Sequence, residues 1–411
     1  MKKLLGITLG IMTALGGFVD LGQIVFTTQA GALFGYQLIW TIAIGTVAIV
    51  VYMEMCGRTA VVAKEPVFAV VRTCLGFRLG VVTLIASNLL NVITCAAELL
   101  GVAIVLHLLT GWPEKIILIG AAAAISALVL LFRFQWIERT FGLSGLLMTV
   151  FAVSAVFLHP QWSQLAKGLL PSFAQPPAKH QLLYGYFAVG LFSAMLMEYE
   201  VHFYSSGALE EDWTPKDLGE NFMVAFLGSV LGSLLTVGLL VVGALVFLPR
   251  GIFPDLLSTG ALGGAFPFAR KALLIALLGI LACIAGAAIE TALSSAYNVC
   301  QFFNCEWGKN RPPTDVPVYT ATWLGVFALA LVIGLVGLRP LQLVDISIIF
   351  GMAITPLTYY PILRVAADKN IMGRHVNSRF ETILGTVVLV LITAAAIVAI
   401  PLMVITHSGK P

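Results

Sequence analysis

Charged side chains are scarce in this 411-residue chain. Only 10% of the residues are Asp, Glu, Lys or Arg, while 59% are hydrophobic, and an ordinary soluble domain carries about 25% charged residues. A soluble core cannot hide so much apolar surface, so the composition excludes a soluble globular protein and indicates a chain whose solvent is lipid. The net charge of +3 says little about partners, because position matters more than the sum in a membrane protein.

Motifs of catalysis and tight metal binding are also missing. The six cysteines form no CxxC pair, which argues against a zinc or redox site, and they lie in or beside apolar runs, where a thiol packs as a small hydrophobic group. Nucleophile, dinucleotide and phosphate motifs do not stand in a fitting context. We therefore expect no enzyme, no cofactor and no nucleic-acid partner.

Long apolar runs are what the chain has in abundance. About 11 of them are as long as the roughly 20 residues that a helix needs to cross the hydrocarbon layer. Asp20 interrupts the first run and no cleavage site follows it, so this run is a membrane helix rather than a secretory signal. No linker can hold a second domain, so 1–411 is one membrane transport domain. The expected spans are 6–32, 34–58, 76–109, 114–133, 141–159, 183–208, 222–249, 270–303, 316–338, 341–363 and 381–406.

Lys and Arg predict the orientation in the membrane. With the N-terminus in the cytoplasm and the spans alternating, 15 of the 23 basic residues lie inside and 8 lie outside. The positive-inside rule thus predicts a multi-pass protein of the cell membrane with a cytoplasmic N-terminus. An odd number of spans then places the C-terminus outside.

Seven carboxylates fall inside the expected spans, although a charge there costs about 3 kcal/mol on insertion scales. Glu54 lies four residues before Arg58, which predicts an ion pair on one helix face. A helix start near Asp345 favours a carboxylate through the helix dipole. Glu290 either faces a polar cavity or pairs locally, and the sequence leaves both open. The seven are Asp20, Glu54, Glu98, Glu198, Glu200, Glu290 and Asp345.

Two spans are expected to be broken helices. Asp20 sits mid-span among glycines, which weaken a helix, and no mid-span Lys or Arg is available to pair with it. The sixth span likewise holds two acids and His202 beside Met197, whose thioether is either a packing group or a soft metal ligand. We predict unwinding near Asp20–Gln23 and near Met197–Glu200. Broken helices one and six indicate a central ion site in an inverted repeat of five plus five helices, over 6–160 and 183–365, with an extra helix at 381–406.

Six segments follow one another along the chain and carry a resemblance. They are Asp20-Leu21-Gly22-Gln23, Gln29-Ala30-Gly31-Ala32-Leu33-Phe34-Gly35-Tyr36, Glu54-Met55-Cys56-Gly57-Arg58, Thr94-Cys95-Ala96-Ala97-Glu98-Leu99-Leu100-Gly101, Ala194-Met195-Leu196-Met197-Glu198-Tyr199 and Ile371-Met372-Gly373-Arg374-His375-Val376-Asn377. In this order they resemble motifs of the NRAMP family of divalent metal transporters, and the segment from Gln29 to Tyr36 is the most specific match. The resemblance covers nearly the whole chain.

The resemblance implies a LeuT-type fold and a set of metal ligands. The carboxylate of Asp20, the amide oxygen of Gln23 and the thioether of Met197 would hold the ion, together with the backbone carbonyls of Gly17 and Ala194. Oxygen ligands suit Mg²⁺ and Mn²⁺, whereas sulfur favours softer ions such as Mn²⁺, Fe²⁺ or Cd²⁺.

The chain also departs from the family pattern. Leu21 and Gln23 replace Pro and Asn of the first motif, and Cys95 replaces an acid of the third helix. Pro-His of the sixth helix has become Glu198-Tyr199, and span 316–338 holds no Arg. Only Glu98 remains of the family's proton route, so we expect weak or absent proton coupling, as in the NRAMP-related magnesium transporters this chain resembles. The possible accessory or proton-route residues are Glu98, Glu198, Glu200, Tyr199 and His202.

The leading function is therefore a monomeric importer of divalent metal ions, with Mn²⁺ or Fe²⁺ and Mg²⁺ as rival cargoes. The alternative is a LeuT-fold transporter of an amino acid or another small organic solute. Such sites present a helix N-terminus to the carboxylate of the solute, which Asp20, Glu198 and Glu200 would repel. A membrane sensor is not supported, since no signalling domain is attached.

Overall fold

The computed structural model describes residues 19–171, 181–265 and 269–409, and within these ranges the chain forms helices, turns and loops without a strand. Ten helical segments there are long and apolar enough to cross a membrane. Large apolar side chains such as Leu131, Val336 and Ile397 lie exposed on them. In lipid only a helix or a closed barrel satisfies its backbone groups internally, so this architecture confirms the predicted all-α polytopic class. The division into two repeats stays a prediction.

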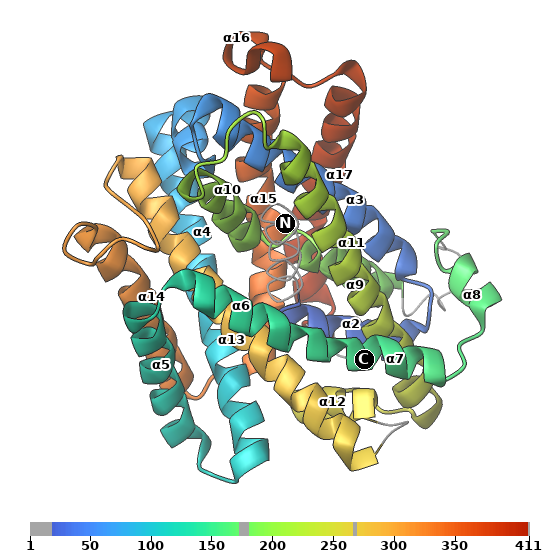
Figure 1. Ribbon diagram of the computed structural model, residues 1–411. Helices are drawn as coiled ribbons and strands as arrows, with labels where there is room; N and C mark the ends of the chain where they lie inside the picture. Colours follow the sequence, from blue (N-terminus) through green and yellow to red (C-terminus); the bar gives the residue numbers. More distant parts are fainter. Residues whose placement is uncertain (1–18, 172–180, 266–268, 410–411) are drawn as a thin grey trace.

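Figure 1 shows the order of the helices along the chain. The 24-residue segment Phe134–Phe157 consists of α6, a 3₁₀ turn at Leu146–Met148 and α7, and α11 continues through a π turn to Arg250. The helices are α2 (Leu21–Phe34), α3 (Ile39–Ala63), α4 (Val67–Thr110), α5 (Glu114–Leu131), α6 (Phe134–Gly145), α7 (Thr149–Phe157), α8 (Trp162–Lys167), α9 (Gln181–Ala194), α10 (Glu198–Glu210), α11 (Leu218–Val242), α12 (Leu257–Ala265), α13 (Ala269–Phe303), α14 (Pro317–Val336), α15 (Pro340–Ala366), α16 (Lys369–Met372) and α17 (Arg379–Ile405).

Most predicted spans coincide with these helices, and the deviations have local causes. The third span, placed at 76–109, matches the longer part of α4, because Gly76 with a positive φ of 74° is non-helical and separates a shorter helical segment, 67–75, from the rest. The fifth was placed at 141–159, but its helix begins at Phe134. This earlier start brings Glu138 into a membrane helix. Much of the first predicted span, before residue 19, lies outside the described residues.

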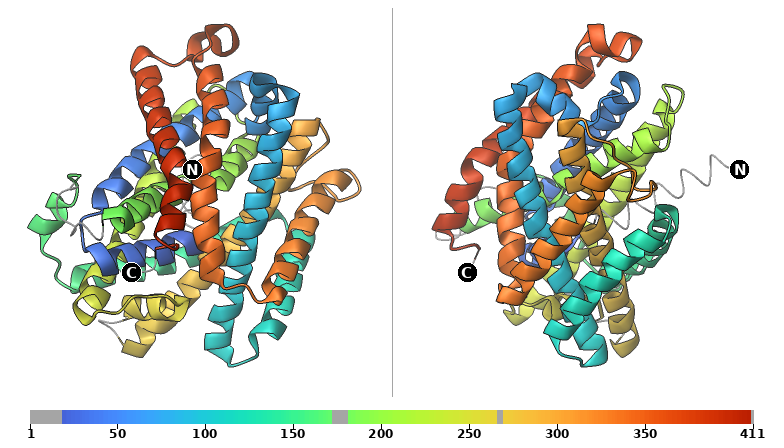
Figure 2. Two further views of the ribbon diagram at one scale, coloured as in Figure 1. Left: turned by 180° about the vertical axis from the view of Figure 1, so that it is seen from behind. Right: turned by 90° about the vertical axis from the view of Figure 1, so that its left-hand side faces the viewer.

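Three long helices form the centre of the bundle. Helix α4 packs along both α13 and α15, and α15 in turn packs along α17, as the rear view in Figure 2 shows. At one edge α5 and α14 run beside α4. The short helices α2, α9 and α10 are enclosed by this frame, and nearly every residue of α2 is buried. The frame thus keeps the ends of α2, α9 and α10 away from lipid.

Two of the sequence motifs are explained by packing. Arg58 is buried, donates Nε to Glu54 at 2.8 Å, and also donates to the carbonyl of His375 and the Oδ1 of Asn377, both at 2.6 Å. The predicted Glu54–Arg58 ion pair is confirmed. Because Arg58 joins α3 to the segment after α15, these motifs tie two distant parts of the chain together.

Candidate functional site

Asp20 lies at the N-terminal end of α2 and is 1% exposed. Its backbone is extended, and its Oδ1 accepts a hydrogen bond from the backbone N–H of Gln23 at 2.7 Å, which is the geometry of a helix N-cap. Tyr199 donates its hydroxyl to Oδ2 at 3.4 Å. In the described part of the chain no Lys, Arg or His forms an ion pair with Asp20. One oxygen of this carboxylate therefore lacks a strong partner.

The sixth span is broken, as predicted, but the break lies slightly earlier in the chain. Helix α9 ends at Ala194 and α10 begins at Glu198, so the non-helical residues are Met195–Met197. The predicted unwinding near Met197–Glu200 is confirmed at Met197 and not at Glu198–Glu200, because these residues form the first turn of α10, where acids favour the positive helix end. The predicted unwinding near Asp20–Gln23 is confirmed at Asp20 and not beyond it. Helix α2 starts at Leu21, and of the described residues before it Val19 and Asp20 are non-helical.

Gln23 connects the two helix ends. Its Nε2 donates to the carbonyl oxygen of Ala194 at 2.8 Å, and its Oε1 is buried without a partner. Of the predicted ligands, the structure thus brings Asp20, Gln23 and the Ala194 carbonyl together. Met197 caps α10 at the break and is 8% exposed, whereas Gly17 lies outside the described residues.

Glu98 is a further buried acid beside this site. Its carboxylate accepts a hydrogen bond from the backbone N–H of Leu21, next to Asp20, at 3.1 Å. The Oε1 of Glu200 and both ring nitrogens of His202 are buried without partners, and the His202 ring meets Phe68 edge-on at 5.1 Å. The site therefore holds more buried acceptors than the described protein groups satisfy.

Glu198 is held by hydroxyl groups that the sequence did not single out. Ser87 of α4 donates to its Oε2 at 3.1 Å, and Thr358 of α15 donates to its Oε1 at 2.9 Å. Both oxygens are thus engaged by α4 and α15 rather than by the Asp20 site. Hydroxyl side chains are common in membrane helices, where they bond to the preceding turn, so their spacing carried no signal.

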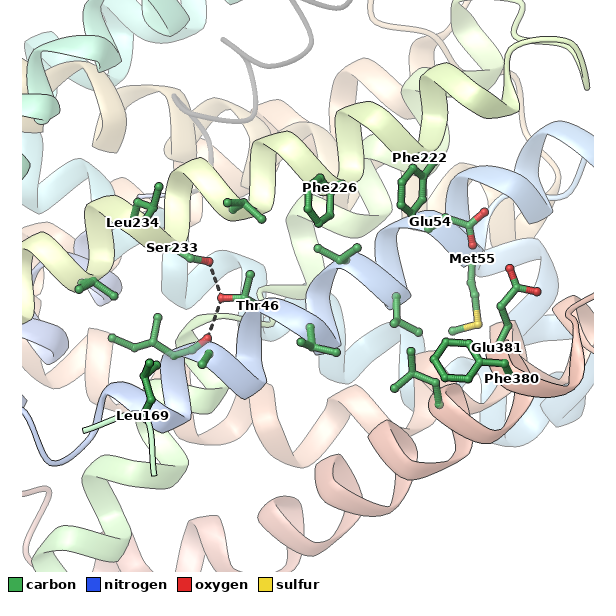
Figure 3. A pocket seen from close by; sticks show the side chains of 18 of the residues that line it. Thr46, Glu54, Met55, Leu169, Phe222, Phe226, Ser233, Leu234, Phe380 and Glu381 are labelled. Carbon is green, nitrogen blue, oxygen red and sulfur yellow. Dashed lines mark hydrogen bonds between the residues drawn. The ribbon is translucent and has the colours of Figure 1, made fainter. Parts of the chain in front are cut away.

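A wide groove lies elsewhere, between α3, α11 and α17 (Figure 3). Its volume is about 760 Å³, and apolar side chains such as Phe222, Phe226 and Phe380 line most of it. Polar groups are confined to the bonded pair Thr46 and Ser233 and to the end that holds Glu54 and Glu381. None of the predicted metal ligands that the structure describes lines this groove.

The donor set at Asp20 suits reversible binding of an ion. Within the described ranges no group of three or more His, Cys, Asp or Glu is arranged to hold a metal, so a closed site of the zinc type is not present there. One carboxylate, one amide and one carbonyl, with the Met197 thioether at the nearby helix break, make a weaker and mixed set. The C-terminal end of α9 also presents its backbone carbonyls there, and this end of a helix dipole favours cations.

Three comparisons place the chain among known proteins. It is 23% identical to the divalent metal cation transporter MntH of Bacillus subtilis over 392 residues, covering 92% of this chain and 87% of the relative. It is 25% identical to the MntH of Ralstonia nicotianae over 403 residues, with the same coverage. Among solved structures it resembles a variant of the manganese transporter of Eremococcus coleocola, with a TM-score of 0.78, 19% identity, and coverage of 98% and 87%.

The fold is shared more widely. MhsT in complex with L-phenylalanine matches with a TM-score of 0.62 at 16% identity, over 96% of this chain and 98% of that one. These likenesses confirm the predicted transporter fold. The model of the family described as natural resistance-associated macrophage protein-like matches residues 10–401, and the chain therefore belongs to the Nramp family.

Proposed function

We propose that this protein is a transporter that imports divalent metal ions. The observation that carries the proposal is the Asp20 carboxylate, buried at a helix end opposite the break between α9 and α10, with no described cation to pair with it. A mobile cation supplies the missing charge. Membership of the Nramp family and relatives named divalent metal cation transporters support the same cargo.

Metal binding would rearrange Gln23. An ion cannot use the carbonyl oxygen of Ala194 while the Nε2 of Gln23 donates to it at 2.8 Å. We infer that the amide turns so that its unpartnered Oε1 joins Asp20, Ala194 and Met197 as a ligand. The exchange of one hydrogen bond for an ion contact keeps the cost of binding and release small.

An organic solute is the second candidate, because the fold is shared with a protein seen in complex with L-phenylalanine. A carboxylate of such a solute would meet Asp20 and the buried acids Glu98 and Glu200. Like charges in a site of low polarity repel strongly. A divalent metal ion is therefore favoured over an organic solute as the transported substrate.

The remaining features of the proposal follow from the sequence. We propose that the transporter works as a monomer without a bound cofactor and has no enzymatic activity. We propose a cytoplasmic N-terminus, which places the loop between α13 and α14 in the cytoplasm. Mn²⁺-like ions and Mg²⁺ remain rival cargoes.

Ion uptake into liposomes that contain the purified protein tests the function. We expect Mn²⁺ or Mg²⁺ to enter faster than into protein-free liposomes and to saturate, while Ca²⁺ enters more slowly. L-phenylalanine and other amino acids serve as competing substrates in the same assay. Uptake of an amino acid in place of any metal would overturn the proposal in favour of the second candidate.

A further inference from the structure

Glu290 is a buried acid that the proposed Asp20 site does not use. It lies on α13, is 9% exposed, and lines a small cavity between α13 and α6. Among the described residues no hydrogen bond or ion pair engages its carboxylate. Glu138 of α6 lines the same cavity. Two facing helices thus direct a carboxylate each toward one small space.

The cavity has the size of a single ion. Its volume is about 20 Å³, and about 10–15 Å³ of such space is enough for one water molecule. Gly142 and Gly286 are part of its lining and leave the room that larger side chains would fill. The space admits one water molecule or one largely dehydrated cation.

The charges around the cavity favour weak and reversible binding of a cation. Glu138, Glu200 and Lys309 are charged side chains close enough to interact with Glu290. The Lys309 ammonium lies 4.6 Å from the ring centre of Phe134, 5.2 Å from that of Phe203 and 3.9 Å from Glu211. The Lys309 ammonium therefore lies beside the cavity. It reduces the repulsion between the two carboxylates when no ion is bound, and it lowers the affinity of the cavity for a cation.

Hydrogen bonds link α13, the helix that carries Glu290, to the Asp20 site. Ser294, one turn after Glu290 on α13, donates its hydroxyl to the backbone carbonyl of Tyr199 at 3.0 Å, and the hydroxyl of Tyr199 faces Asp20. On its other side the cavity approaches Lys309, which belongs to the loop between α13 and α14. Phe134 lines the cavity together with both acids and has the Lys309 ammonium over its ring, so the cavity adjoins the α13–α14 loop.

We propose that Glu290 and Glu138 form a second, transient binding site for the divalent ion, on its way between the Asp20 site and the side of the α13–α14 loop. This inference rests on the proposed function. Carboxylate oxygens are the ligands that hard divalent ions prefer, and two carboxylates match the charge of one such ion. Because the Lys309 ammonium lies nearby, the ion binds weakly to the two carboxylates and is readily released.

Mn²⁺ binding to the purified protein tests the second site without transport. Calorimetry or the electron paramagnetic resonance of Mn²⁺ should detect a weaker class of site that survives Asp20→Ala. Adding Glu290→Gln to Asp20→Ala should weaken this class about tenfold, and adding Glu114→Gln, at an exposed acid on α5, should leave it unchanged. Equal weak binding in the Asp20→Ala protein with and without Glu290→Gln would overturn the second site.

Transport separates this inference from the proposed function. Single Glu290→Gln and Glu138→Gln should each lower the maximal Mn²⁺ uptake rate about tenfold while the affinity of the Asp20 site, measured by binding, stays within twofold of wild type. That unchanged affinity also shows that the variants fold. If wild-type protein transports Mn²⁺ and both variants keep its rate, the second site is wrong and the function stands. If wild-type protein neither binds nor transports a divalent ion, both fail.

Discussion

The Asp20 side chain combines a structural and a functional role in its two oxygens. Oδ1 caps α2 through the backbone of Gln23, and among the described residues Oδ2 accepts a single, long hydrogen bond, from Tyr199. Capping alone needs no charge, because Asn caps helices as well as Asp does. The two roles can therefore be separated by substitution at this residue.

Asp20→Asn should fold normally and fail to transport. The amide oxygen preserves the cap, but the ion's charge is no longer compensated, so the affinity for Mn²⁺ should fall by more than about 100-fold. Asp20→Ala should lose transport and in addition about 1 kcal/mol of stability, because the cap is lost. Thermal unfolding and Mn²⁺ uptake measure the two effects. An Asp20→Asn protein that transports at the wild-type rate would show that this carboxylate only caps α2.

Met197→Ala should change selectivity rather than abolish transport. A thioether adds to the binding of soft ions and not to that of Mg²⁺, so Cd²⁺ and Mn²⁺ should lose about tenfold in affinity while Mg²⁺ loses little. Met148→Ala, at a buried methionine in the turn between α6 and α7, is the matched control. Calorimetric titration with each ion measures the effect. Equal losses for all three ions would mean that Met197 shapes the cavity without binding the metal.

The sequence predicted single side chains unevenly. The Glu54–Arg58 pair was predictable, because residues four apart on a helix face each other. The bond from Gln23 to Ala194 joins positions 171 residues apart, and no local pattern encodes such a contact. The hydroxyl groups that bond to Glu198 could not be predicted from the sequence for the same reason.

At the scale of the helices, the sequence predicted where spans exist better than where they end. Apolar length sets the existence of a span, while its ends depend on single backbone conformations such as the positive φ at Gly76. The start of α6 at Phe134 shows the consequence. The sequence left Glu138 in a loop, whereas the structure places it in a membrane helix facing Glu290.

Two glycines test how helix packing limits substitution. A Cβ on Gly31 of α2 would lie 2.2 Å from the carbonyl oxygen of Leu240 on α11, whereas a Cβ on Gly120 of α5 would meet nothing within 4 Å. Gly31→Ala should therefore destabilise the protein by about 1–3 kcal/mol. Gly120→Ala should stabilise it by up to about 1 kcal/mol, since Ala is the better helix former. Thermal unfolding in detergent compares them, and a Gly31→Ala protein as stable as Gly120→Ala would contradict the close contact of α2 with α11.

For the whole molecule, composition and the order of the motifs were sufficient to predict the class and the family. Few charges and many long apolar runs leave little choice but a helical membrane protein. The site was predicted only in part. Asp20 stood out as an acid in an apolar span, but the position of the helix break and the role of Gln23 depend on how α2, α9 and α10 meet, which is a property of the assembled bundle.

Coupling to protons is the last property of the whole molecule that the chain's residues address. A proton that travels with the metal needs a series of titratable groups through the membrane, built from Asp, Glu and His. At the site, Tyr199 faces Asp20, and a tyrosine gives up its proton only in alkaline solution. Helix α14, Pro317–Val336, contains no basic residue. Glu98 remains beside Leu21 as the main candidate for a proton carrier.

We therefore expect metal uptake with little or no accompanying proton flux. Liposomes with an internal pH dye should show Mn²⁺ or Mg²⁺ entry without matching acidification. An imposed proton gradient should change the uptake rate by less than about twofold. The reason is that a proton can shift the conformations of the transporter only if it binds to them with different affinities. Glu98→Gln should then transport at a rate close to wild type. The opposite result is equally clear: acidification that rises and saturates with metal entry and disappears in Glu98→Gln would show that this acid alone is sufficient to couple protons to the metal.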